Sequence, residues 1–290
     1  MDSAPVSRRA FLAGGAGIAL AAATAGATAG PAAALLPAKN KAISPLVLSS
    51  DLYASAEPQR FVFAIARGSR YASFGPAQVA FAAPGSSEGT ILDTTLYKQG
   101  LPKGRGIYVA EASFPTAGVW RAQALLPDAQ GKRVPFAVTV KPTAVAPVVG
   151  AAAPRAASPT NTNTLGVNPI CTRSPACPLH DVSLTDVIGN GKPAAVMFAT
   201  PALCQSQYCG PVLDELLDIM GPYQQKGVQT VHVEIYASTR GATTSPTVQA
   251  WGIETEPWLF TIGPDGTIKE RLDGAMATNE IQAALDRLVA

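Results

Sequence analysis

Apolar and polar residues alternate in short runs between residues 44 and 141, with Gly, Pro, Ser and Asp clusters between the runs. Five runs have this pattern: RFVFAIA, AQVAFAA, GIYVAEASF, GVWRAQALL and VPFAVTV. Successive side chains of a strand point to opposite faces, so a two-residue period indicates strands with one buried face. Several such strands, with only turn residues between them, predict an antiparallel β-sandwich over residues 44–141.

The pattern changes in the last part of the chain, over residues 169–290. PAAVMFAT and VQTVHVEIYA are continuous apolar runs suited to buried strands, and GPVLDELLDIMGPYQQKG between them has apolar residues at helical spacing. This order predicts a β-α-β unit with parallel strands. TEPWLFTIGPDGTIKERLDG then predicts a hairpin that turns at Asp265 and Gly266, and TNEIQAALDRLVA predicts a closing helix capped by Thr278 or Asn279.

The segment between these two regions, residues 142–168, is rich in Pro, Ala, Thr and Asn and shows no periodicity. Such a composition has few apolar side chains to bury, and its prolines favour an extended chain. We therefore expect a linker that lets two domains move relative to each other. A chain of 290 residues is long enough for two domains of ordinary size.

The first residues have the features of an export signal. SRRAFLAGGAGIALAAATAGATAG contains Arg8 and Arg9, a modestly apolar stretch, and small residues suited to cleavage near Ala29. This segment resembles a twin-arginine signal at residues 1–29, followed by a spacer at 30–43. Its apolar run is shorter than the roughly 18 residues of a spanning helix. We expect a mature protein without a membrane span, located in the periplasm, in the cell wall or outside the cell.

The charge pattern excludes some partners. The chain has 22 basic and 20 acidic residues without long runs of one sign, so it offers no broad charged surface for nucleic acid or anionic lipid.

Four cysteines follow the signal, and export makes disulfides the simplest expectation for them. Four thiols allow three pairings, and proximity in sequence favours Cys171 with Cys177 and Cys204 with Cys209. The first pair lies in Pro-rich sequence ahead of the first strand of the β-α-β unit, which favours a structural disulfide. The second pair lies between an apolar strand and a helix.

Two segments around the second pair resemble the thioredoxin-like superfamily, in particular extracytoplasmic redoxins, over residues 178–290. PLHDVSLTDVIGNGKPAAVMFATPALC is similar to the family's segment with a short SL.D strand, a GKP turn, the central strand and the active-site thiols. GIETEPWLFTIGPDGTIKERLDG is similar to the segment that carries the family's cis-proline, which falls on Pro257. The resemblance implies a thioredoxin-like fold and disulfide exchange with no cofactor.

A weaker resemblance concerns the sandwich. GIYVAEASFPTAGVWRAQALL is similar to the late strands of immunoglobulin-like modules in exported bacterial proteins, with Tyr108, Gly118 and Trp120 at the matching positions. The whole chain is thus expected to combine an N-terminal all-β, immunoglobulin-like sandwich with a C-terminal α/β, thioredoxin-like domain.

The cysteine spacing departs from the thioredoxin pattern, because four residues separate Cys204 from Cys209 where the family has two. Counting from the strand makes Cys204 the attacking thiol, whereas matching CGP makes Cys209 the attacking thiol. Gly210 and Pro211 suit a helix start after Cys209, where backbone N–H groups and the helix dipole stabilise a thiolate. The residues favour Cys209 as the better stabilised thiolate and leave both assignments open.

The expected function is thiol–disulfide exchange through Cys204 and Cys209 with exported proteins or small thiols, recycled by a redox partner. The alternative is a cell-envelope binding or scaffold protein in which both disulfides are structural. A third hypothesis is copper delivery by the second cysteine pair and a histidine. His232 lies within an apolar strand and His180 ahead of the first strand of the β-α-β unit, so we expect ordinary histidines and no metal.

Overall fold

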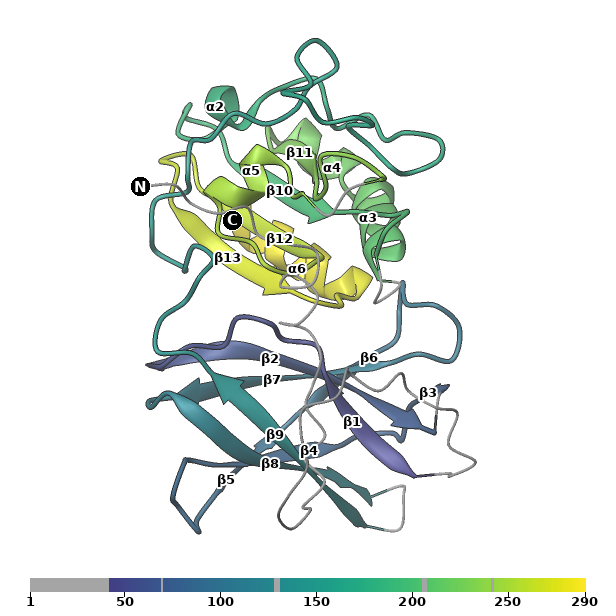
Figure 1. Cartoon of the computed structure of the whole chain (residues 1–290), viewed down its shortest axis with the longest axis vertical. Helices are drawn as coiled ribbons and strands as arrows, with labels where there is room; N and C mark the ends of the chain where they lie inside the picture. The colour runs from purple at the N-terminus through teal and green to yellow at the C-terminus, as the bar shows by residue number, and fades with distance from the viewer. Residues whose placement is uncertain (1–41, 69, 128–130, 205–207, 241–242) are drawn as a thin grey trace.

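The computed structural model describes residues 42–68, 70–127, 131–204, 208–240 and 243–290. The export signal expected at residues 1–29 lies outside the described residues, as does most of the spacer at 30–43. In the described part of the chain, no helix is both long and apolar enough to cross a membrane. Figure 1 shows a β-domain and a mixed α/β domain stacked along the long axis of the molecule.

The N-terminal domain consists of two antiparallel sheets around one core. One sheet has the order β1-β2-β7-β6 with β3 paired to β2, and the other has the order β5-β4-β8-β9. The alternating apolar residues of β7 and β8 face this core, as their two-residue burial pattern shows. The strands are β1 (Ile43–Val47), β2 (Ser55–Arg67), β3 (Arg70–Ala72), β4 (Gln78–Ala82), β5 (Thr90–Asp93), β6 (Thr95–Tyr97), β7 (Ile107–Phe114), β8 (Gly118–Leu126) and β9 (Lys132–Val140).

All five strands that the alternation predicts are present, as β2, β4, β7, β8 and β9. The alternation missed β1, β3, β5 and β6, which have only three to five residues each. So few residues cannot display a period.

The C-terminal domain contains one mixed sheet in the order β11-β10-β12-β13. As expected, β10 and β11 are parallel, and β12 and β13 form an antiparallel hairpin. Every residue of the central strand β10 is buried, because one apolar cluster covers each face of the sheet. The strands are β10 (Ala194–Ala199), β11 (Gln229–Glu234), β12 (Trp258–Ile262) and β13 (Ile268–Asp273).

Two helical segments of this domain differ from expectation. The SL.D segment forms the short helix α2 instead of a strand, with Ser183 as its N-cap residue. The apolar pattern after Cys209 is divided into two helices at Met220, because Pro222 follows and lacks a backbone N–H. The helices are α2 (Leu184–Val187), α3 (Cys209–Ile219), α4 (Gly221–Gln225), α5 (Pro246–Ala250) and α6 (Thr278–Leu288).

The last helix starts earlier than either expected cap, Thr278 or Asn279, allows. Ala277 is the N-cap residue of α6, and its backbone N–H donates to Glu280 Oε2 at 3.1 Å. The Thr278 hydroxyl instead donates to the carboxylate of Glu215 on α3. A glutamate at the third helical position thus caps the helix without a capping hydroxyl.

Residues 142–168 do not form the freely extended linker that their composition predicts. Ala152 pairs with Thr267, and backbone hydrogen bonds join this segment to Gly266 and Ile268 beside strand β13. At its far end, Asn168 N–H donates to the carbonyl of Ala237. The open edge of β13 has backbone N–H and C=O groups that need hydrogen-bond partners. The segment supplies these partners, so backbone hydrogen bonds hold it in place although it has few apolar side chains to bury.

The two domains are joined by buried charges as well as by this segment. The Arg60 guanidinium from β2 contacts Glu280 Oε1 at 3.0 Å and donates to the backbone carbonyls of Asp273 and Ala275. At another point of the interface, Asp51 accepts hydrogen bonds from Arg271 Nη2 at 2.9 Å and from Lys141 Nζ at 3.0 Å. These paired charges join the two domains in this structure, where the linker composition predicts domains that move relative to each other.

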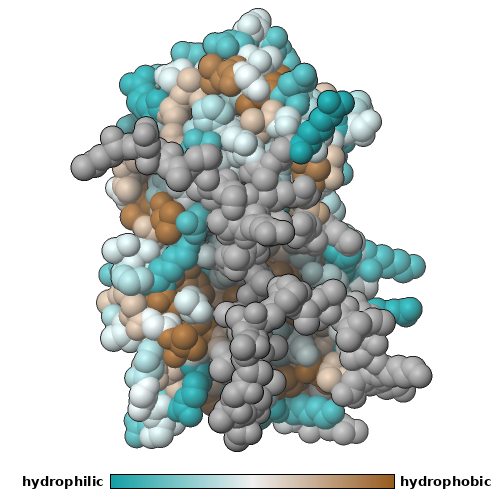
Figure 2. Space-filling model, viewed as in Figure 1, coloured by the Kyte–Doolittle hydropathy of each residue, from teal (hydrophilic) through white to brown (hydrophobic). Residues whose placement is uncertain are grey.

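The outer face drawn in Figure 2 carries hydrophilic side chains interspersed with smaller apolar areas over both domains. This is the ordinary surface of a globular protein, where isolated apolar residues are common.

Replacing Arg60 by leucine should destabilise the protein by about 3 to 5 kcal/mol, because the buried carboxylate of Glu280 loses its charged partner. Urea unfolding monitored by tryptophan fluorescence measures this loss. The exposed Arg121 provides the matched control, and Arg121→Leu should change the free energy of unfolding by less than about 0.5 kcal/mol. Equal losses in both variants would show that the interface charges do not hold the domains together.

Candidate functional site

The thiols of Cys204 and Cys209 lie beyond the end of the central strand. Strand β10 ends at Ala199, and the Thr200 carbonyl accepts the backbone N–H of Cys204 at 3.0 Å, which turns the chain. Helix α3 then begins at Cys209, with Gly210 and Pro211 in its first turn as predicted. Residues 205–207 between the two cysteines lie outside the described part of the chain.

The two sulfurs lie close together, and all four cysteines of the chain are reduced thiols in this structure. Cys204 Sγ, Cys209 Sγ and a carboxylate oxygen of Glu256 all lie within 4.8 Å of one another. Cys204 is partly exposed, whereas Cys209 is completely buried. A reagent in solvent would therefore reach the Cys204 sulfur before the Cys209 sulfur.

The start of helix α3 stabilises negative charge on Cys204 more directly than on Cys209. The Cys209 backbone N–H donates to Cys204 Sγ at 3.3 Å, so the first N–H of the helix points at the Cys204 sulfur. An N–H group and the positive end of the helix dipole both favour a thiolate at that place.

The sequence favours Cys209 as the better stabilised thiolate, but the surroundings of its sulfur do not support that prediction. Burial raises the pKa of the Cys209 thiol well above its usual value, and the nearby Cys204 and Glu256 raise it further. The helix position is the one expected from the sequence, but desolvation of a completely buried sulfur outweighs the dipole. These surroundings therefore favour the protonated form of the Cys209 thiol.

Pro257 lies at the same end of the sheet as the two thiols. The Glu256–Pro257 peptide bond is cis, as the resemblance to redoxins implies, and Pro257 immediately precedes β12. Strand β12 pairs with β10 in antiparallel fashion, which brings Pro257 beside the turn that follows β10. The cis-proline and the thiol pair therefore lie at one end of two neighbouring strands.

The N-terminal domain contacts the cysteine loop directly. The ring of Tyr71 meets the ring of Tyr208 edge to face, with centroids 5.8 Å apart. The Arg105 guanidinium lies 4.6 Å from the Tyr71 ring centroid and 5.5 Å from that of Tyr208. Because Tyr208 immediately precedes Cys209, the sandwich packs against the start of helix α3.

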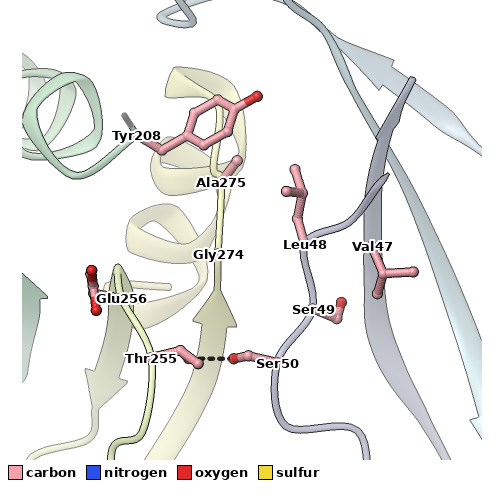
Figure 3. A pocket seen from close by; sticks show the side chains of 9 residues that line it. All are labelled: Val47, Leu48, Ser49, Ser50, Tyr208, Thr255, Glu256, Gly274 and Ala275. Atoms are coloured by element: carbon pink, nitrogen blue, oxygen red, sulfur yellow. Dashed lines mark hydrogen bonds between the residues drawn. The ribbon is translucent and has the colours of Figure 1, made fainter. Parts of the chain in front are cut away.

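A small hollow lies between the domains beside these residues (Figure 3). The 47–50 segment of the sandwich forms one wall, and Thr255 hydroxyl donates to Ser50 Oγ at 2.6 Å across it. Tyr208 and Glu256 line the side nearest the thiols. Its volume of about 80 Å³ is well below the roughly 300 to 1,000 Å³ of ordinary ligand pockets, so it suits a side chain rather than a cofactor.

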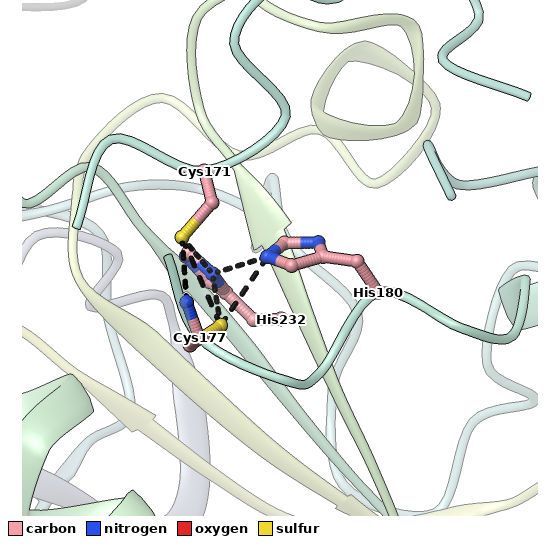
Figure 4. A group of neighbouring side chains, drawn as sticks. All are labelled: Cys171, Cys177, His180 and His232. Carbon is pink, nitrogen blue, oxygen red and sulfur yellow. Dashed lines mark hydrogen bonds between the residues drawn. The ribbon is translucent and has the colours of Figure 1, made fainter. Parts of the chain in front are cut away.

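Cys171 and Cys177 do not form the disulfide that the sequence predicts. Their sulfurs are 3.8 Å apart, whereas an S–S bond is about 2.05 Å long. Both side chains are buried, and both point toward two histidines, as Figure 4 shows. The loop brings the two sulfurs into contact without joining them by a bond.

His180 and His232 are part of this second cluster and do not approach the other cysteine pair as ligands. Cys177 Sγ is 3.2 Å from His180 Nε2 and 3.3 Å from His232 Nδ1. The hydrogen bond with Cys177, followed by those with the two histidines, lowers the pKa of the Cys171 thiol despite burial. Both histidines are buried, and both rings face thiols, which their positions in the sequence did not predict.

A signal for this cluster was present in the sequence. CTRSPACPLH places two cysteines and a histidine within ten residues, which is a ligand spacing that a single loop can bring together. His232 had no such signal, since its place beside the loop follows from the parallel register of β10 and β11, where it lies opposite Met197.

Comparisons with known proteins found structural similarity over only part of the chain. No protein-family model matches the sequence, and no curated protein matches it. A Chlorobium tepidum structure assigned as the thiol:disulfide interchange protein DsbE is 18% identical, with a TM-score of 0.37, over 49% of this chain and 99% of that chain. A thioredoxin-like superfamily structure is 15% identical, with a TM-score of 0.25, over 38% of this chain and 86% of that chain. The similarity to thioredoxin-like proteins is thus distant and partial.

Replacing Glu256 by glutamine should lower the pKa of Cys209, because a negative charge near the sulfur disfavours the thiolate. The ¹³Cβ chemical shift of Cys209, followed by NMR across a pH series, measures this pKa. Glu88, which is exposed and lies in the sandwich, supplies the control variant Glu88→Gln. An unchanged Cys209 titration in Glu256→Gln would mean that the carboxylate does not act on this sulfur.

Proposed function

We propose that the protein exchanges disulfides with exported proteins or small thiols through Cys204 and Cys209, and that Cys204 is the attacking thiol. The observation that carries this proposal is the arrangement of the pair at the start of helix α3. Cys204 is partly exposed and accepts the first helical N–H, while the buried Cys209 lies behind it. Pro257, which precedes the neighbouring strand β12, supports the same function through the resemblance to redoxins.

The exchange proceeds in two steps. The Cys204 thiolate attacks one sulfur of a substrate disulfide, the substrate S–S bond breaks, and the leaving sulfur takes up a proton from water. Cys209 then loses its proton and attacks Cys204 Sγ, which breaks the mixed disulfide and releases the second substrate thiol. The substrate gains two electrons and the protein pair loses them, so a dithiol partner must reduce the pair for the next cycle. The same steps in reverse would oxidise a substrate.

Glu256 is placed to receive the proton of Cys209 in the second step. Its carboxylate lies within 4.8 Å of both sulfurs, close enough for transfer through one water molecule. While Cys204 carries negative charge, that charge and Glu256 both raise the pKa of Cys209. Formation of the mixed disulfide removes the Cys204 charge, so Cys209 becomes easier to deprotonate when its attack is needed.

The sandwich and the compartment complete the proposal. We infer that the sandwich is immunoglobulin-like, which is supported by buried Tyr108 and Trp120 and by Gly118 at φ +126°. Its contact with Tyr208 gives it a role in positioning the start of helix α3. Export rests on the twin-arginine pattern at Arg8 and Arg9. Exchange of disulfides suits a compartment where they persist.

The alternative function is a binding or scaffold protein of the cell envelope, without exchange chemistry. The complete burial of Cys209 favours this alternative, since a buried thiol with a raised pKa attacks slowly. The two functions differ in whether Cys204 forms a mixed disulfide that Cys209 resolves.

Cys209→Ser should accumulate a mixed disulfide at Cys204 when incubated with insulin, because attack remains and resolution is lost. Cys204→Ser should accumulate no mixed disulfide, because Cys209, the remaining thiol of the pair, is buried. Acid quenching and peptide mass spectrometry identify the adduct. In the dithiothreitol-driven insulin assay, both variants should fall to the uncatalysed rate. A wild-type rate no faster than that of the Cys204→Ser, Cys209→Ser double variant would favour the binding protein.

A further inference from the structure

A second cluster of reactive side chains lies outside the thiol pair: Cys171, Cys177, His180 and His232 (Figure 4). Three of these residues come from the loop ahead of β10, and His232 comes from strand β11. All four side chains are buried, with exposed fractions of 7%, 6%, 2% and 0%. We propose that these four residues bind one zinc ion in a closed, structural site.

The distances between the ligand atoms fit one tetrahedral ion. Zinc bonds of about 2.3 Å to sulfur and 2.05 Å to nitrogen require ligand separations of about 3.8 Å for S···S, 3.6 Å for S···N and 3.3 Å for N···N. The two sulfurs are 3.8 Å apart, and His232 Nδ1 is 3.2 Å from His180 Nε2. His232 Nδ1 is 3.8 Å from Cys171 Sγ and 3.3 Å from Cys177 Sγ.

The hydrogen bond behind His232 presents the correct nitrogen to the ion. His232 Nε2 lies 3.1 Å from the backbone carbonyl of Ala199, and a carbonyl only accepts, so Nε2 carries the proton. The other nitrogen, Nδ1, then has a free lone pair directed at the cluster. Metal-binding histidines commonly donate their second N–H to a carbonyl or carboxylate in this way.

Charge balance also favours a divalent ion with these ligands. Two thiolates and two neutral imidazoles around Zn²⁺ have no net charge, which avoids the cost of an uncompensated charge in a buried place. Thiolate and imidazole together, in tetrahedral arrangement, are typical of zinc. Four protein ligands fill the coordination shell, so the ion has no open position for a substrate.

The ion would join the loop to the sheet near the thiol pair. Thr172, next to Cys171, accepts the backbone N–H of Ala202 at 3.1 Å through its hydroxyl. Ala202 lies two residues before Cys204 in the turn that follows β10. Zinc would thereby support the turn that holds the attacking thiol, without contact with the substrate.

The direct test is metal analysis of the full mature chain, purified under reducing conditions after growth with added zinc. The proposal predicts one zinc per chain by plasma mass spectrometry. Replacing zinc by Co²⁺ should give the visible absorption of a tetrahedral ion and a thiolate charge-transfer band. Removal of zinc with a chelator should lower Tm by at least about 5 °C. These measurements use the wild-type protein, so the test does not depend on whether a variant folds.

Variants locate the ion. Cys171→Ser with Cys177→Ser should lose zinc and the Co²⁺ thiolate band, whereas the matched control, Cys204→Ser with Cys209→Ser, should retain both. The control would lack exchange activity and still bind zinc, so failure of the metal site and failure of the proposed exchange function are distinguishable.

Three results would overturn the proposal. The first is a Cys171–Cys177 disulfide in the exported protein, detected as a cross-linked peptide. The second is retention of zinc by the Cys171→Ser, Cys177→Ser variant with its loss from the control. The third is a chain that takes up Cu⁺ but not Zn²⁺.

Discussion

The site depends on the burial of strand β10 on both faces. Its six residues lie between two apolar clusters, so the strand has one position in the sheet and one register with each neighbour. Parallel pairing places His232 of β11 opposite Met197, and antiparallel pairing places Trp258 of β12 opposite Phe198. The end of β10 therefore brings together the cysteine turn, the histidine of the second cluster and the residue that follows Pro257.

The contacts around this end give the two cysteine pairs different surroundings. Cys204 and Cys209 share a helix start and differ in exposure, which is the arrangement that an attacking and a resolving thiol require. Cys171 and Cys177 are both buried and face imidazoles, so their surroundings suit a bound ion better than a disulfide. The sandwich packs against Tyr208 and contacts the C-terminal domain through Arg60. It therefore helps to position the residues around the thiol pair.

The sequence predicts most of the fold, because long amphipathic strands and the β-α-β order leave a clear period. It also locates the thiol pair, the helix start at Cys209 and the cis-proline. Sequence-based prediction fails where backbone hydrogen bonding or burial determines the structure or the chemistry of a residue. The Pro-rich segment is held by hydrogen bonds to β13 that composition does not reveal. Burial reverses the preference for a Cys209 thiolate. The histidines join the first cysteine pair only through the register of β11, which no local pattern encodes.

The reduction potential of the Cys204 and Cys209 pair tests the exchange function most directly. Equilibration of the protein in a graded dithiol buffer, followed by thiol trapping and mass spectrometry of the peptide that carries both cysteines, gives this potential. Disulfide exchange predicts a value above roughly −270 mV, within the range of exchangeable pairs. A value well below roughly −300 mV would mark a structural disulfide and contradict exchange by this pair.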